Sequence, residues 1–470
     1  MEECPRPRAL FLAPEAPYPA AGGGALRSAS LVQFLAGRYR LDLIVFREPG
    51  SPDPATLVPQ GLFEEVLVLD LAWHSRTKLA RLARNLDRAR RGTPPLADRF
   101  SGFGPAIAAF VRDKHYQMAV IEHLWCAPYW EQIAPRSETV ALDAHNVESV
   151  LTERCAAVES WWMRLLLRRF QQAWVSLERR WLPQFGLILA ASAPDAAALA
   201  ALAPATRICV YPNSLPLMPQ PEVEECSARA HACRVEAHLD AKSLTRVSTR
   251  HAWARALRRA GERVFIAFGG PQGHGDSLTV AARTEPRASA SGLSASTADT
   301  SIVFTGNFEY PPNLDAVRYF HGRIWPLLRK RYPELVWQLA GKNPEAVASF
   351  VQHDRRIQIL GPVEDAVVEL ARARVAIVPL RAGSGTRFKI LEAWAAGRAV
   401  VSTTVGAEGL GAVDGEHLML ADTPERFADA VSALLDSADL RMRLGRAGRR
   451  LYEERYTWES AWASLIEAGL

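Results

Sequence analysis

The sequence predicts an α/β protein with two doubly wound parallel sheets, because one local pattern occurs in both halves. An apolar strand at 9–13 is followed by the glycines of 22–24 and then by a helical stretch. An apolar strand at 375–378 is followed by a glycine loop at 382–385 and another helical stretch. In parallel sheets of this kind, ligands bind where the strands end. We therefore expect one sheet and one ligand-binding edge in each half of the chain.

Composition limits the class of protein. The chain has 470 residues, of which 49% are apolar and 23% charged, which is typical of a soluble globular protein with two domains. The net charge of +5 is weak evidence for nucleic acid binding, and it suits equally an enzyme for anionic diphosphates or contact with an anionic membrane. The cysteines show no CxxC spacing, so we expect free thiols in a reducing compartment. No apolar run is long enough for a signal peptide or a membrane span, so we expect a cytoplasmic protein.

The segment 383–392, Gly-Ser-Gly-Thr-Arg-Phe-Lys-Ile-Leu-Glu, carries the clearest chemistry. A helix expected at 386–396 presents unpaired N–H groups at its start, and Arg387 and Lys389 add positive charge there. These features predict a cradle for a diphosphate. Glu392, one turn further on, can accept hydrogen bonds from two ribose hydroxyls. The alternative is a solvent-facing Glu392 paired with Lys389.

Two polar clusters follow strands in the first half. His123 comes directly after the strand at 118–121, and Asp143 and His145 follow the strand at 139–142. Histidine titrates near neutrality and can hydrogen-bond a sugar hydroxyl or a phosphate oxygen. A histidine at a strand end can also be a packing or capping residue, and that alternative stays open.

The segment 383–392, followed by Ala-Trp-Ala-Ala-Gly-Arg-Ala-Val-Val-Ser-Thr, resembles the donor-site signature of family-four retaining glycosyltransferases, which have the GT-B fold. Many members use a Glu-x7-Glu pair, in which the first Glu contacts the sugar and the second contacts the ribose. Glu392 matches the second, whereas Ser384 stands at the position of the first. The chain instead resembles the branch with a GxGTRxKxxE motif, in which the Arg and Lys take over diphosphate contacts.

The resemblance implies two Rossmann-like domains that face one another across a cleft. We expect an acceptor-binding domain at 1–213, a linker with an irregular insertion at 214–300, and a nucleotide-sugar domain at 301–452. A terminal helix at 453–470 is expected to cross back to the first domain. Within the second domain we expect a helix at 314–332 capped by Asn313.

The resemblance also implies roles for individual residues. The catalytic candidates are His123, Asp143 and His145. The donor-binding candidates are Gly306, Asn307, Gly341, Lys342, Gly383, Ser384, Gly385, Thr386, Arg387, Lys389 and Glu392. The acceptor side is expected to use Gly22, Gly23, Gly24, Asn146 and Glu148, although the three glycines could also be a plain flexible turn. No metal and no cofactor other than the donor substrate is implied.

Two basic stretches lie outside these sites. In the first, 73–91, Leu79, Leu82 and Leu86 recur at helical spacing, which predicts a helix that packs through this stripe and exposes its charges. The second, 159–182, is a long helix rich in Trp and Arg. Packing of its Leu and Trp stripe in the core is the stronger interpretation, and a membrane interface is the alternative.

The resemblance implies transfer of a sugar, with retention, from a nucleoside diphosphate sugar to a glycan or lipid-linked acceptor. Cell-surface or exopolysaccharide biosynthesis is the expected setting, with peripheral contact to an anionic membrane left open and no nucleic acid partner. One alternative is a non-catalytic GT-B scaffold that binds a partner enzyme, which Ser384 and the insertion favour. Another is a nucleotide-sugar epimerase or a phosphorylase on the same fold.

Overall fold

The computed structural model describes residues 6–20, 22–75, 77–221, 300–385 and 387–470. The predicted insertion therefore lies almost entirely outside the described residues, and so does Thr386. The described residues belong to one compact unit. The expected domain limits within this unit remain predictions.

The first half forms a parallel sheet of seven strands in the described part of the chain, in the order β3-β2-β1-β4-β5-β6-β7. Its strands are β1 (Arg8–Ala13), β2 (Arg40–Arg47), β3 (Glu65–Asp70), β4 (Tyr116–Glu122), β5 (Ser137–Ala144), β6 (Leu187–Ala190) and β7 (Arg207–Val210). Its helices are α1 (Gly23–Ala36), α2 (Pro54–Leu57), α3 (Lys78–Arg91), α4 (Pro95–Arg99), α5 (Gly104–Val111), α6 (Trp130–Ile133), α7 (Glu148–Val158), α8 (Trp161–Trp181) and α9 (Ala193–Leu202). Short 3₁₀ turns lie at Leu124–Tyr129, Ala134–Arg136 and Leu182–Gln184.

The second half forms a parallel sheet of six strands among residues 300–470, in the order β10-β9-β8-β11-β12-β13. Its strands are β8 (Ser301–Thr305), β9 (Val336–Ala340), β10 (Ile357–Gly361), β11 (Val375–Val378), β12 (Ala399–Ser402) and β13 (Met419–Leu420). Its helices are α11 (Pro311–Tyr319), a π-helical turn (Phe320–Ile324), α12 (Trp325–Arg331), α13 (Glu345–Val351), α14 (Ala366–Arg372), α15 (Phe388–Ala395), α16 (Pro424–Asp436), α17 (Ala438–Arg455) and α18 (Trp458–Glu467).

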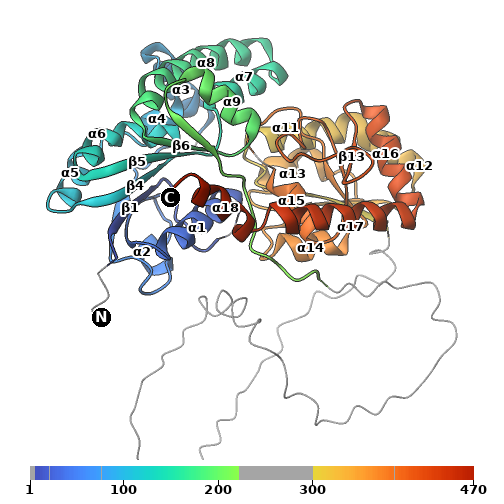
Figure 1. Cartoon of the computed structure of the whole chain (residues 1–470). Coiled ribbons are helices and arrows are strands. Elements are labelled where there is room, and N and C mark those ends of the chain that lie inside the picture. The colour runs from blue at the N-terminus through green and yellow to red at the C-terminus, as the bar shows by residue number, and fades with distance from the viewer. Residues whose placement is uncertain (1–5, 21, 76, 222–299, 386) are drawn as a thin grey trace, which may run out of the picture. The chain divides into compact units, whose positions relative to one another are not determined.

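Each sheet is covered by helices on both faces (Figure 1). In β1, Leu10 and Leu12 belong to one apolar cluster, whereas Ala9 and Phe11 belong to another on the opposite face. Strands buried on both faces need continuous apolar runs, which is what the sequence shows there. The predicted α/β, doubly wound fold class is confirmed.

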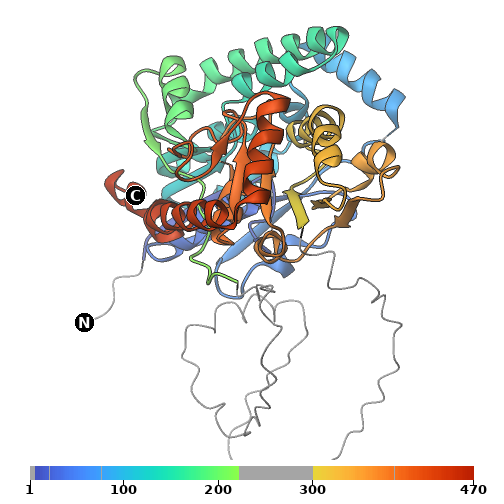
Figure 2. The same ribbon diagram turned by 90° about the vertical axis from the view of Figure 1, so that its right-hand side faces the viewer.

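The end of the chain packs on the first sheet. Trp458, Ala461 and Leu465 of α18 are buried in the same cluster as residues of α1. The Trp462 indole also donates a hydrogen bond of 3.2 Å to the Ser30 carbonyl oxygen. Figures 1 and 2 both show α18 beside α1. The first sheet's core is therefore completed by the last residues of the chain.

Two expected helix starts were wrong. The helix predicted at 314–332 begins at Pro311, because prolines suit the first turn, and the π-helical turn interrupts it. Asn313 does not cap it: its amide donates to the Asn307 carbonyl oxygen at 2.8 Å. Helix α15 begins at Phe388 rather than at Thr386, with Arg387 in extended geometry before it.

The predicted packing of 73–91 was also wrong. Leu79, Leu82 and Leu86 are 81%, 44% and 57% exposed, whereas Arg88 is 7% exposed. In α8 the expected core packing holds for Trp174 and Trp181, which are buried, but not for the exposed Trp161 and Trp162. Both basic helices therefore expose apolar side chains.

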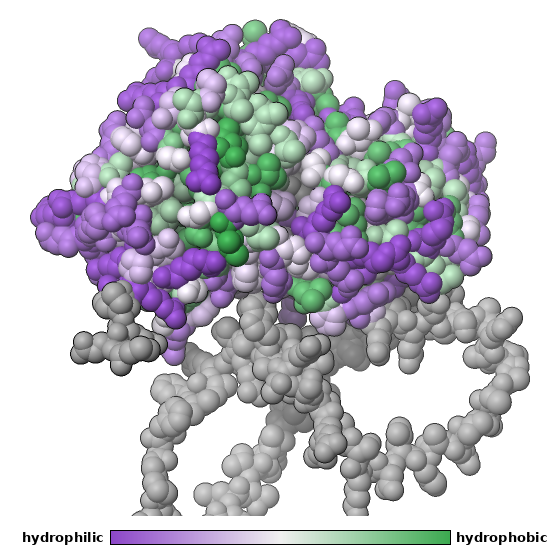
Figure 3. All heavy atoms as spheres, viewed as in Figure 1, coloured by the Kyte–Doolittle hydropathy of each residue, from purple (hydrophilic) through white to green (hydrophobic). Residues whose placement is uncertain are grey.

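No helix in the described ranges is long and apolar enough to cross a membrane. Figure 3 shows one face of the molecule, on which hydrophobic residues lie among many hydrophilic ones.

Candidate functional site

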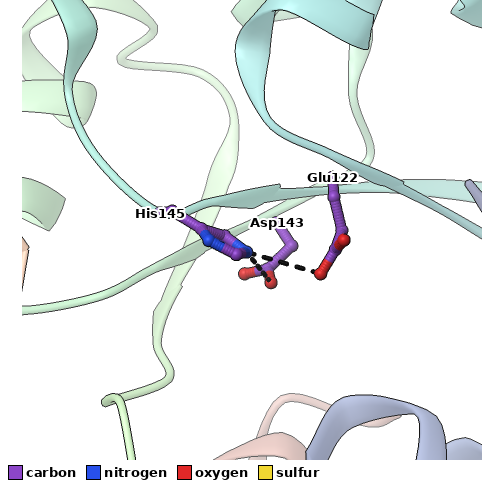
Figure 4. A group of neighbouring side chains, drawn as sticks. All are labelled: Glu122, Asp143 and His145. Atoms are coloured by element: carbon purple, nitrogen blue, oxygen red, sulfur yellow. Dashed lines mark hydrogen bonds and ion pairs between the residues drawn. The ribbon is translucent and has the colours of Figure 1, made fainter. Parts of the chain in front are cut away.

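The polar clusters of the first half meet at neighbouring strand ends. Strands β4 and β5 are paired so that Glu122 lies opposite Asp143. His145 follows β5, and its Nε2 lies 3.1 Å from Asp143 Oδ2 and 3.4 Å from Glu122 Oε1. Figure 4 shows the imidazole directed toward both carboxylates. The structure thus brings Asp143 and His145 together, as the sequence predicts.

His145 is positively charged in this setting. Burial by itself lowers the pKa of an imidazole, but the adjacent carboxylates of Asp143 and Glu122 raise the pKa of His145 to about 9. The ring is therefore protonated at pH 7. A charged imidazolium attracts anions and can donate a hydrogen bond to an oxygen.

Arg27 holds Asp143 from the other side. Its guanidinium is 1% exposed, and Nε lies 3.0 Å from both carboxylate oxygens of Asp143. Its Nη1 also donates to Asn213 Oδ1 at 3.0 Å. Burial would raise the pKa of Asp143, but Arg27 and His145 lower it to about 2. Asp143 is an anion clamped between two cations.

Arg27 and Ser28 are functional-site residues that were not predicted from the sequence. Ser28 donates a hydrogen bond of 2.6 Å to Glu122 Oε1, which leaves Glu122 bound to α1 as well as to His145. The signal in the sequence was Arg27 itself, which is the one charged residue in a helical stretch of mostly small and apolar residues after the three glycines. Such a side chain must be paired if the helix is buried.

His123 lies beside this cluster in a different protonation state. Its ring stacks on Trp125 with centroids 3.9 Å apart, and the ring of His145 is also 3.9 Å away. Burial and then the positive charges of His145 and Arg27 keep the pKa of His123 well below its ordinary value. Its Nδ1 is buried and has no hydrogen-bond partner among the described residues. A neutral and a charged histidine therefore stand side by side.

Glu122, Asp143 and His145 have ligand atoms within 4.8 Å of one another, as a metal site requires. They fit a divalent cation poorly, because Asp143 already accepts from Arg27 and His145 is protonated. The expectation that no metal is needed stays a prediction.

In the second half, two glycine turns touch backbone to backbone. Gly306 follows β8 with φ 151°, and Gly341 follows β9 with φ 150°. A Cβ atom on Gly341 would overlap the Gly306 carbonyl oxygen. Only glycine permits this approach.

Asn307 stabilises the loop after Gly306, since its Oδ1 accepts hydrogen bonds from the Glu309 N–H and the Asn343 amide. The backbone of Lys342 accepts from Phe308 N–H at 3.0 Å.

Lys389 points at the first of these turns. A Cβ atom added at Gly306 would lie 2.6 Å from Lys389 Nζ, so the ammonium group is held against bare backbone. Burial lowers the pKa of Lys389 to about 8, although nearby Glu392 acts in the opposite direction. Within the described ranges no hydrogen bond or ion pair of Lys389 is found. This cation is available to an anionic ligand.

Glu392 lies on the same face of α15, one turn from Lys389. Thr305 Oγ1 is 3.5 Å from its Oε2, at the end of β8. Burial raises the pKa of Glu392 to about 7, and Lys389 only partly offsets this. The alternative of a solvent-facing Glu392 is not what the structure shows.

Arg387 is directed into its own loop. Its guanidinium is 8% exposed and donates to the carbonyl oxygens of Ser384 and, at 3.2 Å, Val405. Burial lowers the pKa of Arg387. The side chain therefore shapes the glycine loop, and its predicted contact with a diphosphate remains a prediction.

The glycine loop also contacts the first half of the chain. Ser384 Oγ donates to Asp195 Oδ1 at 2.9 Å, and Arg154 Nη1 donates to the Gly383 carbonyl oxygen at 2.8 Å. A Cβ atom on Gly385 would lie 2.7 Å from the His145 carbonyl oxygen. The amide of Asn146 lies between the carbonyl oxygens of His145 and Ser384, 3.2 Å from each. Residues 383–385 and 145–147 are therefore in direct contact.

The first glycine loop lies near α15. A Cβ atom on Gly23 would approach Phe388 Cδ2 to 2.5 Å. Gly22 has a φ of 102°, and Gly24 is exposed.

Glu148, a predicted acceptor-side residue, begins α7 and is 5% exposed. Burial and the neighbouring Glu178 raise the pKa of Glu148 to about 7.

Residues 299–437 match the family model described as "Glycosyl transferases group 1". This segment contains both glycine turns, Lys389 and Glu392. A curated relative, an uncharacterized 44.6 kDa protein in the cps region of Klebsiella pneumoniae, is 26% identical over 136 residues. That match covers 27% of this chain and 35% of the relative.

Solved structures resemble the chain over nearly its full length. Sucrose-phosphate synthase from Thermosynechococcus elongatus has a TM-score of 0.65 and 16% identity, with 98% of each chain covered. The fold is GT-B. Anabaena HepE in complex with UDP and glucose has a TM-score of 0.57 and 14% identity, covering 98% of this chain and 99% of HepE. Staphylococcus aureus TarM, in complex with Fondaparinux, α-GlcNAc-glycerol and UDP, has a TM-score of 0.59 and 8% identity, covering 98% and 99%. At these identities the GT-B likeness concerns the fold alone.

Proposed function

We propose that this chain transfers a sugar from a nucleoside diphosphate sugar to a glycan or lipid-linked acceptor. The observation that carries the proposal is the ammonium of Lys389 against the bare backbone of Gly306, without a hydrogen bond or ion pair among the described residues and with Glu392 one turn away. The family match over 299–437 supports it, because that segment contains all three residues.

On the donor side, Lys389 binds the diphosphate and Glu392 binds the ribose. As the bond between the anomeric carbon and the phosphate oxygen breaks, negative charge grows on the leaving diphosphate. A cation fixed beside that oxygen stabilises the transition state more than the ground state. The missing side chains at Gly306 and Gly341 allow the two turns to touch and allow Lys389 to lie against the Gly306 backbone.

On the acceptor side, neutral His123 hydrogen-bonds a sugar hydroxyl, and His145 with Asp143 fixes the orientation of His123. In a transfer with retention, the acceptor oxygen forms the new bond on the face that the phosphate leaves. The acceptor's proton passes to the leaving phosphate oxygen, so no metal or further reagent is required. This description corresponds to the family-four branch with the GxGTRxKxxE motif.

The setting that we propose is cell-surface or exopolysaccharide biosynthesis, at the cytoplasmic face of a membrane. The K. pneumoniae relative from a cps region and the UDP-bound and glycan-bound complexes of similar structures support this choice.

The first test is thermal unfolding of the full chain with a panel of nucleoside diphosphates and their sugars. One nucleotide is expected to raise the midpoint, since a ligand that binds only the folded state stabilises it by mass action. Glu392→Ala should abolish the shift, whereas Glu345→Ala, an exposed glutamate at the start of α13, should keep it. Transfer of the sugar to an acceptor extract is then measured with the nucleotide so identified.

A second candidate is a non-catalytic GT-B scaffold that binds a partner enzyme. The observation that favours it is Ser384, which stands in place of a sugar-binding Glu and is engaged with Asp195. A folded chain that no nucleotide stabilises would support this candidate. An epimerase would invert one carbon of the nucleotide sugar without any acceptor, whereas a phosphorylase would transfer a sugar from a glycan to inorganic phosphate.

A further inference from the structure

Helix α3 has its polarity reversed relative to an ordinary surface helix. Leu79, Leu82 and Leu86, spaced three and four residues apart, form one stripe, and they are 81%, 44% and 57% exposed. The opposite side of the helix carries Arg84 and Arg88. A helix that covers a core normally buries its apolar stripe.

The arginines attach α3 to the protein. Arg88 Nε donates to Asp98 Oδ2 at 2.8 Å, and Arg84 Nη2 donates to the Ser75 carbonyl oxygen at 2.7 Å. From α8, Arg169 Nε donates to the Ala89 carbonyl oxygen at 3.1 Å. Because these bonds fix the polar side of α3 inward, the leucine stripe is held outward.

Neighbouring large apolar residues are exposed as well. In the first turns of α8, Trp161 is 79% exposed and Leu165, four residues later, is 67% exposed. Trp162 is 50% exposed, and Trp73, before α3, is 74% exposed. Figure 2 shows α3 next to α8. We call these residues, with the three leucines, the α3–α8 surface.

The same two helices hold the positive charge of the chain. Helix α3 has six basic residues and one acidic, and α8 has five basic residues and one acidic. The whole chain has 56 basic and 51 acidic residues, so in the rest of the chain as a whole acidic residues slightly outnumber basic ones. The exposed apolar stripe therefore lies within a local positive field.

We propose that the α3–α8 surface docks on the surface of an anionic lipid bilayer. Leucine and tryptophan side chains enter the region between headgroups and acyl chains, and the surrounding arginines bind lipid phosphates. Nucleic acid would satisfy the arginines but leave the leucine stripe in water. A second copy of the chain would cover the leucines but would bring two positive surfaces together.

The docking surface lies on elements that contribute nothing to the donor site. It does not depend on the proposed sugar transfer, and failure of one leaves the other intact. If both hold, docking places a lipid-linked acceptor near the first sheet of a chain that has no described membrane-spanning helix.

The test is co-sedimentation of the full chain with vesicles of phosphatidylcholine alone or mixed equally with phosphatidylglycerol. The chain is expected to bind the mixed vesicles and to be released by high salt. Leu79→Gln/Leu82→Gln/Leu86→Gln should lower the bound fraction about fivefold or more, because the apolar contact is lost. Arg81→Glu/Arg90→Glu should weaken binding to the mixed vesicles by roughly tenfold or more.

Ile466→Gln, which changes an equally exposed apolar residue on α18, is the matched control and should bind as the native chain does. All variants change exposed residues, and an unchanged thermal midpoint shows that they are folded. Equal sedimentation of the leucine variant and the native chain would overturn the proposal. So would binding to duplex DNA but not to vesicles, or a native dimer that the leucine variant converts to monomers.

Discussion

Ser384 donates a hydrogen bond of 2.9 Å to Asp195 although 189 positions separate them in the chain. Both side chains are buried, and Ser192 donates to the second carboxylate oxygen of Asp195 at 2.5 Å. The position at which the resemblance leads one to expect a sugar-binding Glu is thus occupied by a residue that ties the donor loop to α9. The departure from the common motif has a structural use in this chain.

Ser384→Glu is expected to destabilise the protein and not to improve sugar transfer. The new carboxylate would face Asp195 in a buried place, and we expect the free energy of unfolding to fall by about 1–3 kcal/mol. Chemical denaturation and transfer assays measure both quantities. Adding Asp195→Asn should recover part of the lost stability. Higher turnover in the single variant would show that the serine is merely a lost catalytic contact.

Binding of the nucleoside diphosphate should weaken as the pH rises through the pKa of Lys389, about 8. The protonated amine binds the diphosphate and the neutral amine does not, so the dissociation constant should rise about tenfold between pH 7 and pH 9. Isothermal titration calorimetry measures this. Lys389→Arg should remove the pH dependence and keep binding, whereas Lys389→Met should bind weakly at every pH. A flat profile for the native chain would exclude Lys389 from the diphosphate site.

Protonated His145 should increase the free energy of unfolding, and this contribution should be lost at high pH. Its pKa of about 9 in the folded protein lies above the ordinary 6.5, so its contribution is complete below about pH 6.5 and is lost as the pH rises through 9. We expect His145→Gln to be less stable than the native chain by up to about 3 kcal/mol at pH 6. The difference should shrink toward pH 9.5 in urea unfolding experiments. A difference that does not change with pH would mean that His145 acts through packing alone.

Gly341→Ala is expected to abolish the thermal shift by nucleotide and to lower stability by about 2 kcal/mol or more, since its Cβ would overlap the Gly306 carbonyl oxygen. Gly322→Ala is the control, because Gly322 lies in a helical segment and a Cβ there meets nothing within 4 Å. That variant should be unchanged or slightly more stable. Intact nucleotide binding by Gly341→Ala would show that the phosphates bind elsewhere.

Much of the fold can be read from local sequence. Apolar runs such as 9–13 and 375–378 become central strands because burial on both faces requires continuous apolar residues. Glycine turns after strands mark the ends at which polar residues gather. This is why Asp143 and His145, and Lys389 and Glu392, could be proposed as site candidates from the sequence.

Other features depend on partners that lie far apart in the chain. Arg27 pairs with Asp143, 116 positions away, and Ser384 pairs with Asp195. Helix periodicity located the stripe of Leu79, Leu82 and Leu86 but could not say which way it faces.

The sequence by itself determined that this protein has two doubly wound sheets with a cationic glycine loop, because strand and turn propensities act over a few residues. Only the tertiary structure decided which charges are paired and which apolar side chains remain in water. Arg88 of α3 is buried because it forms an ion pair with Asp98. The leucines of α3 are exposed because the opposite side of the helix packs against the protein. Pairing and exposure are properties of neighbours that folding brings together, and a local pattern does not contain them.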